Sequence, residues 1–291
     1  MVRAGLDIDD DLALLCALGS PELDIRGITV TYGNTSVGRA YDDARRLLEM
    51  AGRTDIPIYK GAGWLGRDVN RTTEASRFLV ESFLGPQQGL EIVTLGPLTN
   101  FAAALRAAPE IAGRIQRHVA LGGRTTSGRR EFNFSAHPEA TNRVLAARLP
   151  RVIVPIEVCS SVVFTRRELD AIEARPMTVV FALRRHIRRF MRRKELSRPL
   201  LSRIKRSGCA PEGFHPWDVV AIVYLLRPEL FTQIQSLEVW MQGTRVMNRP
   251  AGLGSRPGCG ALVPFRVDAA AVLDVMMERL GRVRWVRDGD R

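Results

Sequence analysis

The chain has few cysteines, few aromatic residues and no long hydrophobic run, and each shortage excludes a class of protein. Its cysteines, Cys16, Cys159, Cys209 and Cys259, are scattered without a Cys-x-x-Cys pair, which excludes a zinc ribbon and a disulfide framework. This usage fits a reducing cytosol, so we expect a cytoplasmic protein. The longest apolar runs, such as Leu12–Leu18, are too short to span a bilayer, which needs about 20 residues. The start turns acidic at once and does not read as a secretory leader.

Acidic residues are also in short supply, since 43 lysines and arginines outnumber 31 aspartates and glutamates, for a net charge of +12. The basic excess is concentrated in Arg184–Arg206, where Leu183, Ile187, Phe190 and Met191 recur at helical spacing. We favour a surface helix with a solvated basic face. A phosphate-binding patch, and contact with nucleic acid or an acidic membrane, stay open as alternatives.

Strand-like and helix-like runs alternate along the chain, and neither a linker nor a repeat interrupts them, so we expect one domain over residues 1–291. Strands are predicted at Ile25–Thr31, Ile56–Tyr59, Leu90–Leu95, His118–Leu121 and Arg151–Val158, and helices at Ser36–Ala51, Glu74–Phe83, Thr99–Ala107 and Pro138–Arg148. This alternation predicts a Rossmann-like α/β fold, with a mainly parallel central sheet flanked by helices. Ligands bind such sheets at the carboxyl ends of the strands.

An acidic cluster, Asp7-Ile8-Asp9-Asp10-Asp11, precedes an apolar helix-like run. Closely spaced carboxylates repel one another unless a cation or the amides of a helix start receive them. The cluster is therefore either a set of helix caps or a site for Mg²⁺ or Ca²⁺, which prefer oxygen ligands.

Three further polar clusters carry candidate site residues. The turn after Leu95 in Leu-Gly-Pro-Leu-Thr-Asn can expose the Leu95 carbonyl, although Thr99 is also a candidate helix cap. Glu131-Phe132-Asn133-Phe134 suits a strand or loop edge that binds hydroxyls, or an exposed turn. The segment from Gly213 places His215, Trp217 and Asp218 before an apolar helix. Asp218 can be merely the cap of that helix, and a lone histidine is more often structural than catalytic.

Together these clusters resemble the inosine–uridine nucleoside hydrolase family, the nucleoside N-ribohydrolases. The matching stretches are DIDDDLALLCAL, ITVTYGN, DIPIYKGA, EIVTLGPLTNFAAAL, EFNF with HPEA, and HPWDVVAIVYLLRPELF. The resemblance implies Ca²⁺-dependent hydrolysis of the N-glycosidic bond of ribonucleosides. In that chemistry, a carboxylate takes a proton from a water whose pKa the cation lowers. The ribose hydroxyls are held while the ring approaches an oxocarbenium ion.

The resemblance also assigns residues and partners. It implies that Asp10, Asp218 and the Leu95 carbonyl bind the metal. It implies that Asp9, Asn34, Glu131 and Asn133 bind ribose hydroxyls. We expect Ca²⁺ as the cofactor, a small-molecule ribonucleoside as the partner and a homo-oligomer, with neither nucleic acid nor a membrane as a partner.

The chain departs from the family pattern near its start. The family's Asp-x-Asp pair falls on Met1 and Arg3, or on Arg3 and Gly5 with a shorter loop, so we expect this pair to be lacking. Either residues upstream supply it, together with a first apolar strand, or it is lost. Its loss would leave a nucleoside- or ribose-binding relative with little activity. Asp7 is the nearest spare carboxylate and our candidate catalytic base.

The residues expected to contact the leaving base also differ from the family pattern. Trp217 stands where the family often has a histidine, so His215 is our catalytic candidate for assisting the base and Trp217 a candidate for stacking on it. His137 replaces an aspartate before Pro-Glu-Ala. A histidine-containing segment is replaced by residues 64–71, so the sequence does not predict the base preference.

Overall fold

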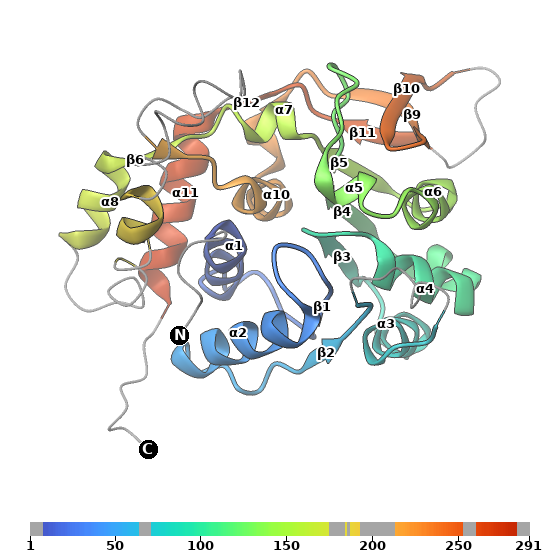
Figure 1. Ribbon diagram of the computed structural model, residues 1–291, viewed down its shortest axis with the longest axis horizontal. Helices are drawn as coiled ribbons and strands as arrows, with labels where there is room; N and C mark the ends of the chain where they lie inside the picture. The colour runs from blue at the N-terminus through green and yellow to red at the C-terminus, as the bar shows by residue number, and fades with distance from the viewer. Residues whose placement is uncertain are drawn as a thin grey trace.

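The computed structural model describes residues 8–63, 71–174, 184, 187–192, 213–252 and 260–283 (Figure 1). Met1, Arg3 and Asp7 lie outside the described residues, as do residues 64–70 and most of the basic run Arg184–Arg206.

The centre of the fold is a mixed sheet of six strands in the order β10-β9-β11-β5-β4-β3. The strands are β3 (Glu91–Thr94), β4 (Arg117–Leu121), β5 (Arg151–Val154), β9 (Gln235–Gln242), β10 (Arg245–Pro250) and β11 (Gly260–Val263). The neighbours from β3 to β11 are parallel, and β9 and β10 are added antiparallel. The predicted α/β fold with a mainly parallel sheet flanked by helices is confirmed.

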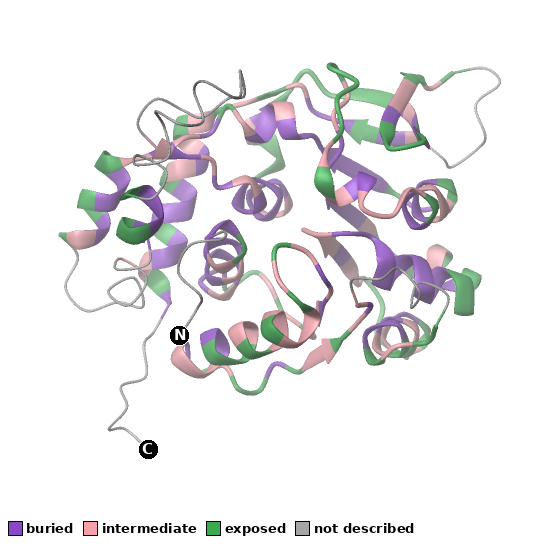
Figure 2. Cartoon of the chain, in the orientation of Figure 1, coloured by how far each residue is buried: buried purple, intermediate pink, exposed green. Residues whose placement is uncertain are grey.

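Helices cover both faces of this sheet (Figure 1). One core joins Val119 and Val152 of the sheet to α1 (Asp9–Leu18), α10 (Trp217–Leu226) and α11 (Ala269–Arg282). The other joins Ala120 and Ile153 to α3 (Glu74–Leu84), α4 (Thr99–Ala107) and α6 (Pro138–Ala146). Successive residues of a strand point to opposite faces, which is why Val119–Leu121 of β4 and Val152–Val154 of β5 are all apolar and buried in the centre (Figure 2).

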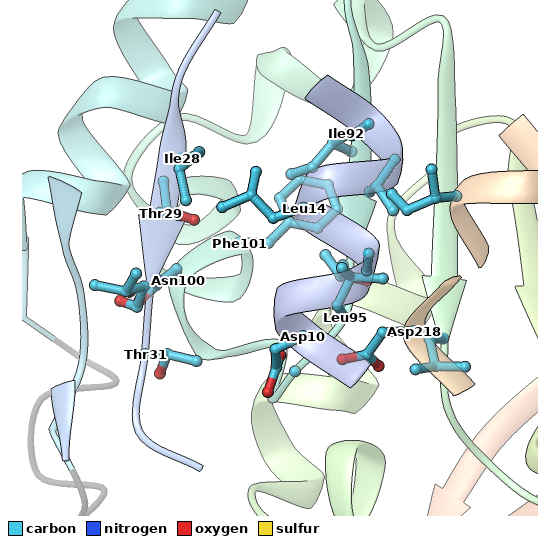
Figure 3. Close-up of a pocket in the computed structure, with 18 of the residues that line it drawn as sticks. Asp10, Leu14, Ile28, Thr29, Thr31, Ile92, Leu95, Asn100, Phe101 and Asp218 are labelled. Carbon is cyan, nitrogen blue, oxygen red and sulfur yellow. Dashed lines mark hydrogen bonds between the residues drawn. The ribbon is translucent and has the colours of Figure 1, made fainter. Parts of the chain in front are cut away.

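A second, two-stranded parallel sheet lies apart from the first. It pairs β1 (Ile28–Val30) with β2 (Ile58–Lys60), and α2 (Val37–Met50) packs against both. The strand of the main sheet that faces it is the edge strand β3. A cleft lined by residues of both β1 and β3 separates the two sheets (Figure 3).

The remaining elements are short. They are α5 (Phe132–Ser135), α7 (Ile156–Cys159), α8 (Arg166–Glu173), β6 (Phe164–Thr165), β7 (Gly213–Phe214), β8 (Phe231–Thr232), β12 (Arg266–Val267) and the 3₁₀ turns Pro109–Arg114 and Pro228–Leu230. Within the described part of the chain, no helix combines the length and the apolar character that crossing a membrane requires. The cysteines in that part, Cys16 and Cys159, are buried free thiols.

One local prediction is wrong. The strand expected to run to Val158 ends at Val154, because Pro155 has no N–H for the strand ladder and instead begins the turn into α7. Of the alternatives left open for Glu131–Phe134, which were a strand edge, a loop edge and an exposed turn, the structure excludes the strand edge. The Glu131 side chain accepts hydrogen bonds from two backbone N–H groups that follow it and so caps the short helix α5.

The amphipathic pattern in the basic run holds where the structure describes it. Ile187, Phe190 and Met191 are buried, whereas Arg189 and Arg192 are exposed, and residues 187–192 are helical. Arg188 pairs with Glu173 on α8. The described part of the run is therefore a helix with a solvated basic face.

Candidate active site

Eight of the predicted site residues lie in one cleft of about 1140 Å³, at the carboxyl ends of β1 and β3. Its lining includes Asp9, Asp10, Asn34, Leu95, Glu131, Asn133, Trp217 and Asp218. His215 is not part of the lining, and Asp7 lies outside the described residues. Segments that lie more than 200 residues apart in the chain, such as those of Asp9 and Asp218, thus form a single site.

The centre of the cleft is a cluster of three carboxylates. One oxygen from each of Asp9, Asp10 and Asp218 lies within 4.8 Å of the other two. Asp9 and Asp218 are 4% and 6% exposed, and Asp10 is exposed. Asp9 and Asp10 begin α1 and Asp218 lies in the first turn of α10, and these two helices pack side by side. Figure 3 shows Asp10, Asp218 and Leu95 grouped around the start of α1.

The three aspartates do not act as helix caps. The cap position of α1 is Ile8 and that of α10 is Pro216, and neither helix has a side-chain cap. The two helix N-termini favour negative charge, but each carries only about half a unit of positive charge. Three clustered carboxylates need more than that, and a hard divalent cation such as Ca²⁺ or Mg²⁺ takes this type of oxygen ligand. The donor set therefore fits such a cation.

The prediction that this end of the chain lacks its acidic pair is not borne out. Asp9 and Asp10 bring two carboxylates from the start of the chain to Asp218. The family resemblance assigns only Asp10 of these two residues to the metal, and the fold makes both of them part of one three-carboxylate cluster.

The Leu95 carbonyl lies just past the end of β3, next to the end of β4. The side-chain amide of Asn133 donates to the Leu95 oxygen at 2.9 Å and to the Leu121 oxygen at 3.3 Å. A carbonyl oxygen has two lone pairs, so this hydrogen bond leaves one for a cation. Asn133 holds the two strand ends together, and its own carbonyl oxygen accepts no hydrogen bond within the described residues.

Glu131 organises the loop that follows β4. Its carboxylate accepts hydrogen bonds from the backbone N–H of Gly123 at 2.8 Å, Asn133 at 2.6 Å and Phe134 at 3.1 Å. Burial raises the pKa of Glu131, and these three hydrogen bonds oppose the rise. Gly122 is required here, because a Cβ at its φ of 150° would lie 2.5 Å from the Phe134 ring.

On the other side of the cleft, Asn100 holds the end of β1 in place. Its side chain accepts from the Ala62 N–H at 3.0 Å and donates to the Val30 carbonyl at 3.1 Å. Thr99 does not cap α4, whose cap position is Leu98, and its hydroxyl instead lies 3.1 Å from that of Thr31. The sequence marked this turn as polar but did not assign a role to Asn100.

His215 and Trp217 have different positions relative to the cleft. Trp217 is part of the cleft lining, and its Nε1 is buried without a hydrogen-bond acceptor in the part of the chain that the structure describes. His215 stacks parallel to Trp217, with ring centroids 5.9 Å apart, and its Nδ1 lies 2.9 Å from the Val162 carbonyl. His137 lies outside the lining, where its Nδ1 accepts from the Ala140 N–H and caps α6.

Comparisons with known proteins give one consistent result. The family described as inosine-uridine preferring nucleoside hydrolase matches residues 4–274. A pyrimidine-specific ribonucleoside hydrolase, RihA, from Citrobacter koseri is 27% identical, and the match covers 94% of each chain. An uncharacterized Schizosaccharomyces pombe protein, C1683.06c, is 26% identical over 94% of this chain and 96% of its own.

Solved structures share the fold. A plant nucleoside hydrolase, PpNRh1, superposes with a TM-score of 0.81 at 24% identity, over 95% of this chain and 96% of its own. A purine-preferring ribonucleoside hydrolase from Gardnerella vaginalis superposes with a TM-score of 0.82 at 23% identity, over 96% of both chains. At these identities the superpositions establish the arrangement of strands and helices.

Proposed function

Because the chain belongs to the inosine-uridine preferring nucleoside hydrolase family, we propose that it hydrolyses the N-glycosidic bond of ribonucleosides to free base and ribose in a Ca²⁺-dependent reaction. The observation that carries this proposal is the convergence of Asp9, Asp10 and Asp218 at the strand ends. A cytoplasmic location and a homo-oligomeric state belong to the same proposal.

The cation is assigned to Asp10, Asp218 and the Leu95 carbonyl, which lie around the start of α1 (Figure 3). When bound, a divalent cation lowers the pKa of water and polarises the oxygens near it. The protein holds the ligands in advance, since Asp10 and Asp218 begin rigid helices and Asn133 fixes the Leu95 carbonyl.

The ribose is assigned to Asp9, Asn34 and Asn133. The carbonyl oxygen of Asn133 accepts no hydrogen bond within the described residues, so a ribose hydroxyl can donate to it. Asp9 and Asn34 line the same cleft, and their role is the one that the family resemblance implies. A buried acceptor left without a donor costs about 1–3 kcal/mol, so a sugar that lacks one hydroxyl is disfavoured. Glu131 contributes by holding the loop that carries Asn133.

The base is assigned to Trp217, which is part of the cleft lining and whose ring N–H is an unused donor. His215 stacks on this ring outside the cleft lining, and its role in assisting the base stays a prediction. The catalytic role of Asp7 remains a prediction from the sequence. Relatives named for pyrimidine and for purine substrates are both similar to this chain, so we leave the base preference open.

The test is base release from uridine, cytidine, inosine, adenosine and their 2′-deoxy forms, measured in Ca²⁺, in Mg²⁺ and in EDTA. We expect release from ribonucleosides in Ca²⁺, little from deoxynucleosides and none in EDTA.

Asp218→Asn should lower the rate by at least about 100-fold, because it removes a buried ligand charge. Asp170→Asn, on the exposed face of α8, is the matched control and should keep full activity. Release that is equal in Ca²⁺ and EDTA, or no release from any ribonucleoside, would contradict the proposal.

A further inference from the structure

The loop between β4 and α5 brings positive charge into the cleft. Three arginines, Arg124, Arg129 and Arg130, precede Glu131 in this loop. Arg124 and Arg130 line the cleft that contains the three aspartates, whereas Arg129 does not. Neither the family resemblance nor the site described above uses these two guanidinium groups.

Arg124 has an unused donor at a buried position. Its Nε is shielded from solvent and has no hydrogen-bond acceptor among the described residues, where the side chain also forms no ion pair. A guanidinium stays charged at any working pH, so burying one of its donors without an acceptor costs free energy. Glu131, whose charge interacts with that of Arg124, already accepts three backbone hydrogen bonds. An anionic ligand in the cleft would satisfy this donor.

The backbone around Arg124 is held firmly. On one side, the Gly123 N–H donates to Glu131, and on the other, the Asn248 amide donates to the Thr125 carbonyl at 2.8 Å. Farther along the loop, the Thr126 and Ser127 hydroxyls donate to Glu157 at 3.0 and 3.2 Å. Arg124 is thus presented by an ordered loop, which reduces the entropy that a ligand must remove on binding.

Arg130 provides the second positive charge. Its Nε donates to the Ser135 hydroxyl at 3.0 Å, which sets the direction of the guanidinium, and it has no ion-pair partner within the described residues. Two guanidinium groups offer forked donors that match the oxygens of a phosphate. Neither ribose nor a neutral nucleobase carries a negative charge, so a phosphate is the part of a nucleotide that would need them.

We propose that Arg124 and Arg130 form a phosphate subsite, so that the preferred substrate is a ribosyl phosphate such as a nucleoside 5′-monophosphate. This inference rests on the proposed glycosidase function, because it concerns the same cleft. The three aspartates repel a phosphate, and the interaction is only partly screened at physiological salt, where the Debye length is about 8 Å. The two arginines offset that repulsion locally, so the phosphate binds only when their positive charges are present.

The first experiment compares kcat/KM for uridine 5′-monophosphate and uridine, and for inosine 5′-monophosphate and inosine. We expect the monophosphates to be preferred by about tenfold or more, which is the effect of one charge-assisted hydrogen bond.

Arg124→Ala should lower this preference by about the same factor. Arg129→Ala, in the same loop but outside the cleft lining, is the matched control and should keep the preference. A preference for the unphosphorylated nucleosides, or one that Arg124→Ala leaves unchanged, would overturn the subsite. Arg130→Ala repeats the test if Arg124→Ala does not fold.

The second experiment is calorimetry with ribose 5-phosphate and with ribose, in EDTA, so that no cation can bind the phosphate. We expect the phosphate ester to bind more tightly than ribose, and Arg124→Ala to remove the difference. Equal affinity for the two sugars in the unmodified protein refutes the subsite. Base release from nucleosides without a preference for phosphate would support the glycosidase proposal and contradict the phosphate subsite. Tighter binding of the sugar phosphate without base release from any substrate would support the subsite and contradict the glycosidase proposal.

Discussion

At the scale of single residues, the charge of the cleft is set by three carboxylates, and the helix N-termini alone do not neutralise them. Asp9 and Asp218 are buried and Asp10 faces the cleft, with one oxygen from each within 4.8 Å of the others. Without a cation, each added negative charge raises the free energy of the folded state. With a cation, the same charges supply its binding energy.

This balance predicts opposite effects of Asp10→Asn with and without Ca²⁺. In EDTA the variant should be more stable than the parent by roughly 1 kcal/mol, because one of three repelling charges is gone and its partial exposure screens the effect. In Ca²⁺ the parent should gain thermal stability and the variant much less. Thermal unfolding in both buffers measures this, with Asp42→Asn on exposed α2 as the control. An equal Ca²⁺ shift in parent and variant would show that Asp10 is not a ligand.

At the scale of elements, one side chain of α4 ties the small sheet to the rest of the molecule. Asn100 bonds both the Val30 carbonyl at the end of β1 and the Ala62 N–H just after β2. The chain approaches this amide so closely that a Cβ on Gly61 would lie 1.9 Å from the Asn100 Oδ1. The hydrogen bond of Asn100 to Val30 fixes the end of β1, and Asn34, which follows this strand, lines the cleft.

A double-mutant cycle tests this contact. Asn100→Ala should destabilise the protein by about 2–4 kcal/mol, because it leaves the buried Ala62 N–H without an acceptor and removes a second hydrogen bond. Gly61→Ala should cost about 1–3 kcal/mol through the clash. In the double variant the methyl group replaces the missing amide, so Gly61→Ala should cost at least about 1 kcal/mol less there than in the parent. Urea unfolding of the four proteins provides the energies, and additive costs would contradict the contact.

At the scale of the whole molecule, the charge of +12 is distributed unevenly. The cleft centre is acidic, whereas the described part of the basic run is a helix with exposed Arg189 and Arg192. A solvated basic face acts through net charge alone, whereas a dedicated polyanion site acts through particular side chains.

The two possibilities predict different retention on heparin. For a solvated face, we expect Arg189→Glu and Arg192→Glu to reduce the salt needed for elution by the same small step as Arg148→Glu, which is exposed elsewhere. Base release should not change, because neither arginine lines the cleft. A much larger step for Arg189→Glu or Arg192→Glu than for Arg148→Glu would indicate a polyanion site in the basic run.

The positions of most strands and helices could be predicted from the sequence, because local periodicity, glycines and prolines mark them. The helix Thr99–Ala107 was predicted with the bounds that the structure has, and the Ser36 and Thr73 caps explain two helix starts. The sequence left Glu131–Phe134 open as a strand edge, a loop edge or an exposed turn, because a short polar segment has more than one local solution. In the structure, the Glu131 carboxylate accepts hydrogen bonds from backbone N–H groups of a helical turn, which decides between these alternatives.

The sequence by itself determined the order of strands and helices, because hydrophobic periodicity depends on near neighbours. It also showed which acidic, amide and aromatic residues are candidates for the site, because their chemistry is local. Only the tertiary structure decided that Asp9, Asp10 and Asp218 share one cluster, that Trp217 and not His215 lines the cleft, and that Arg124 enters it. These relations depend on how α1, α10 and the loop after β4 pack on the sheet. Contacts between residues that are distant in the chain leave no periodic signal in the sequence, so they become visible only when the elements are packed together.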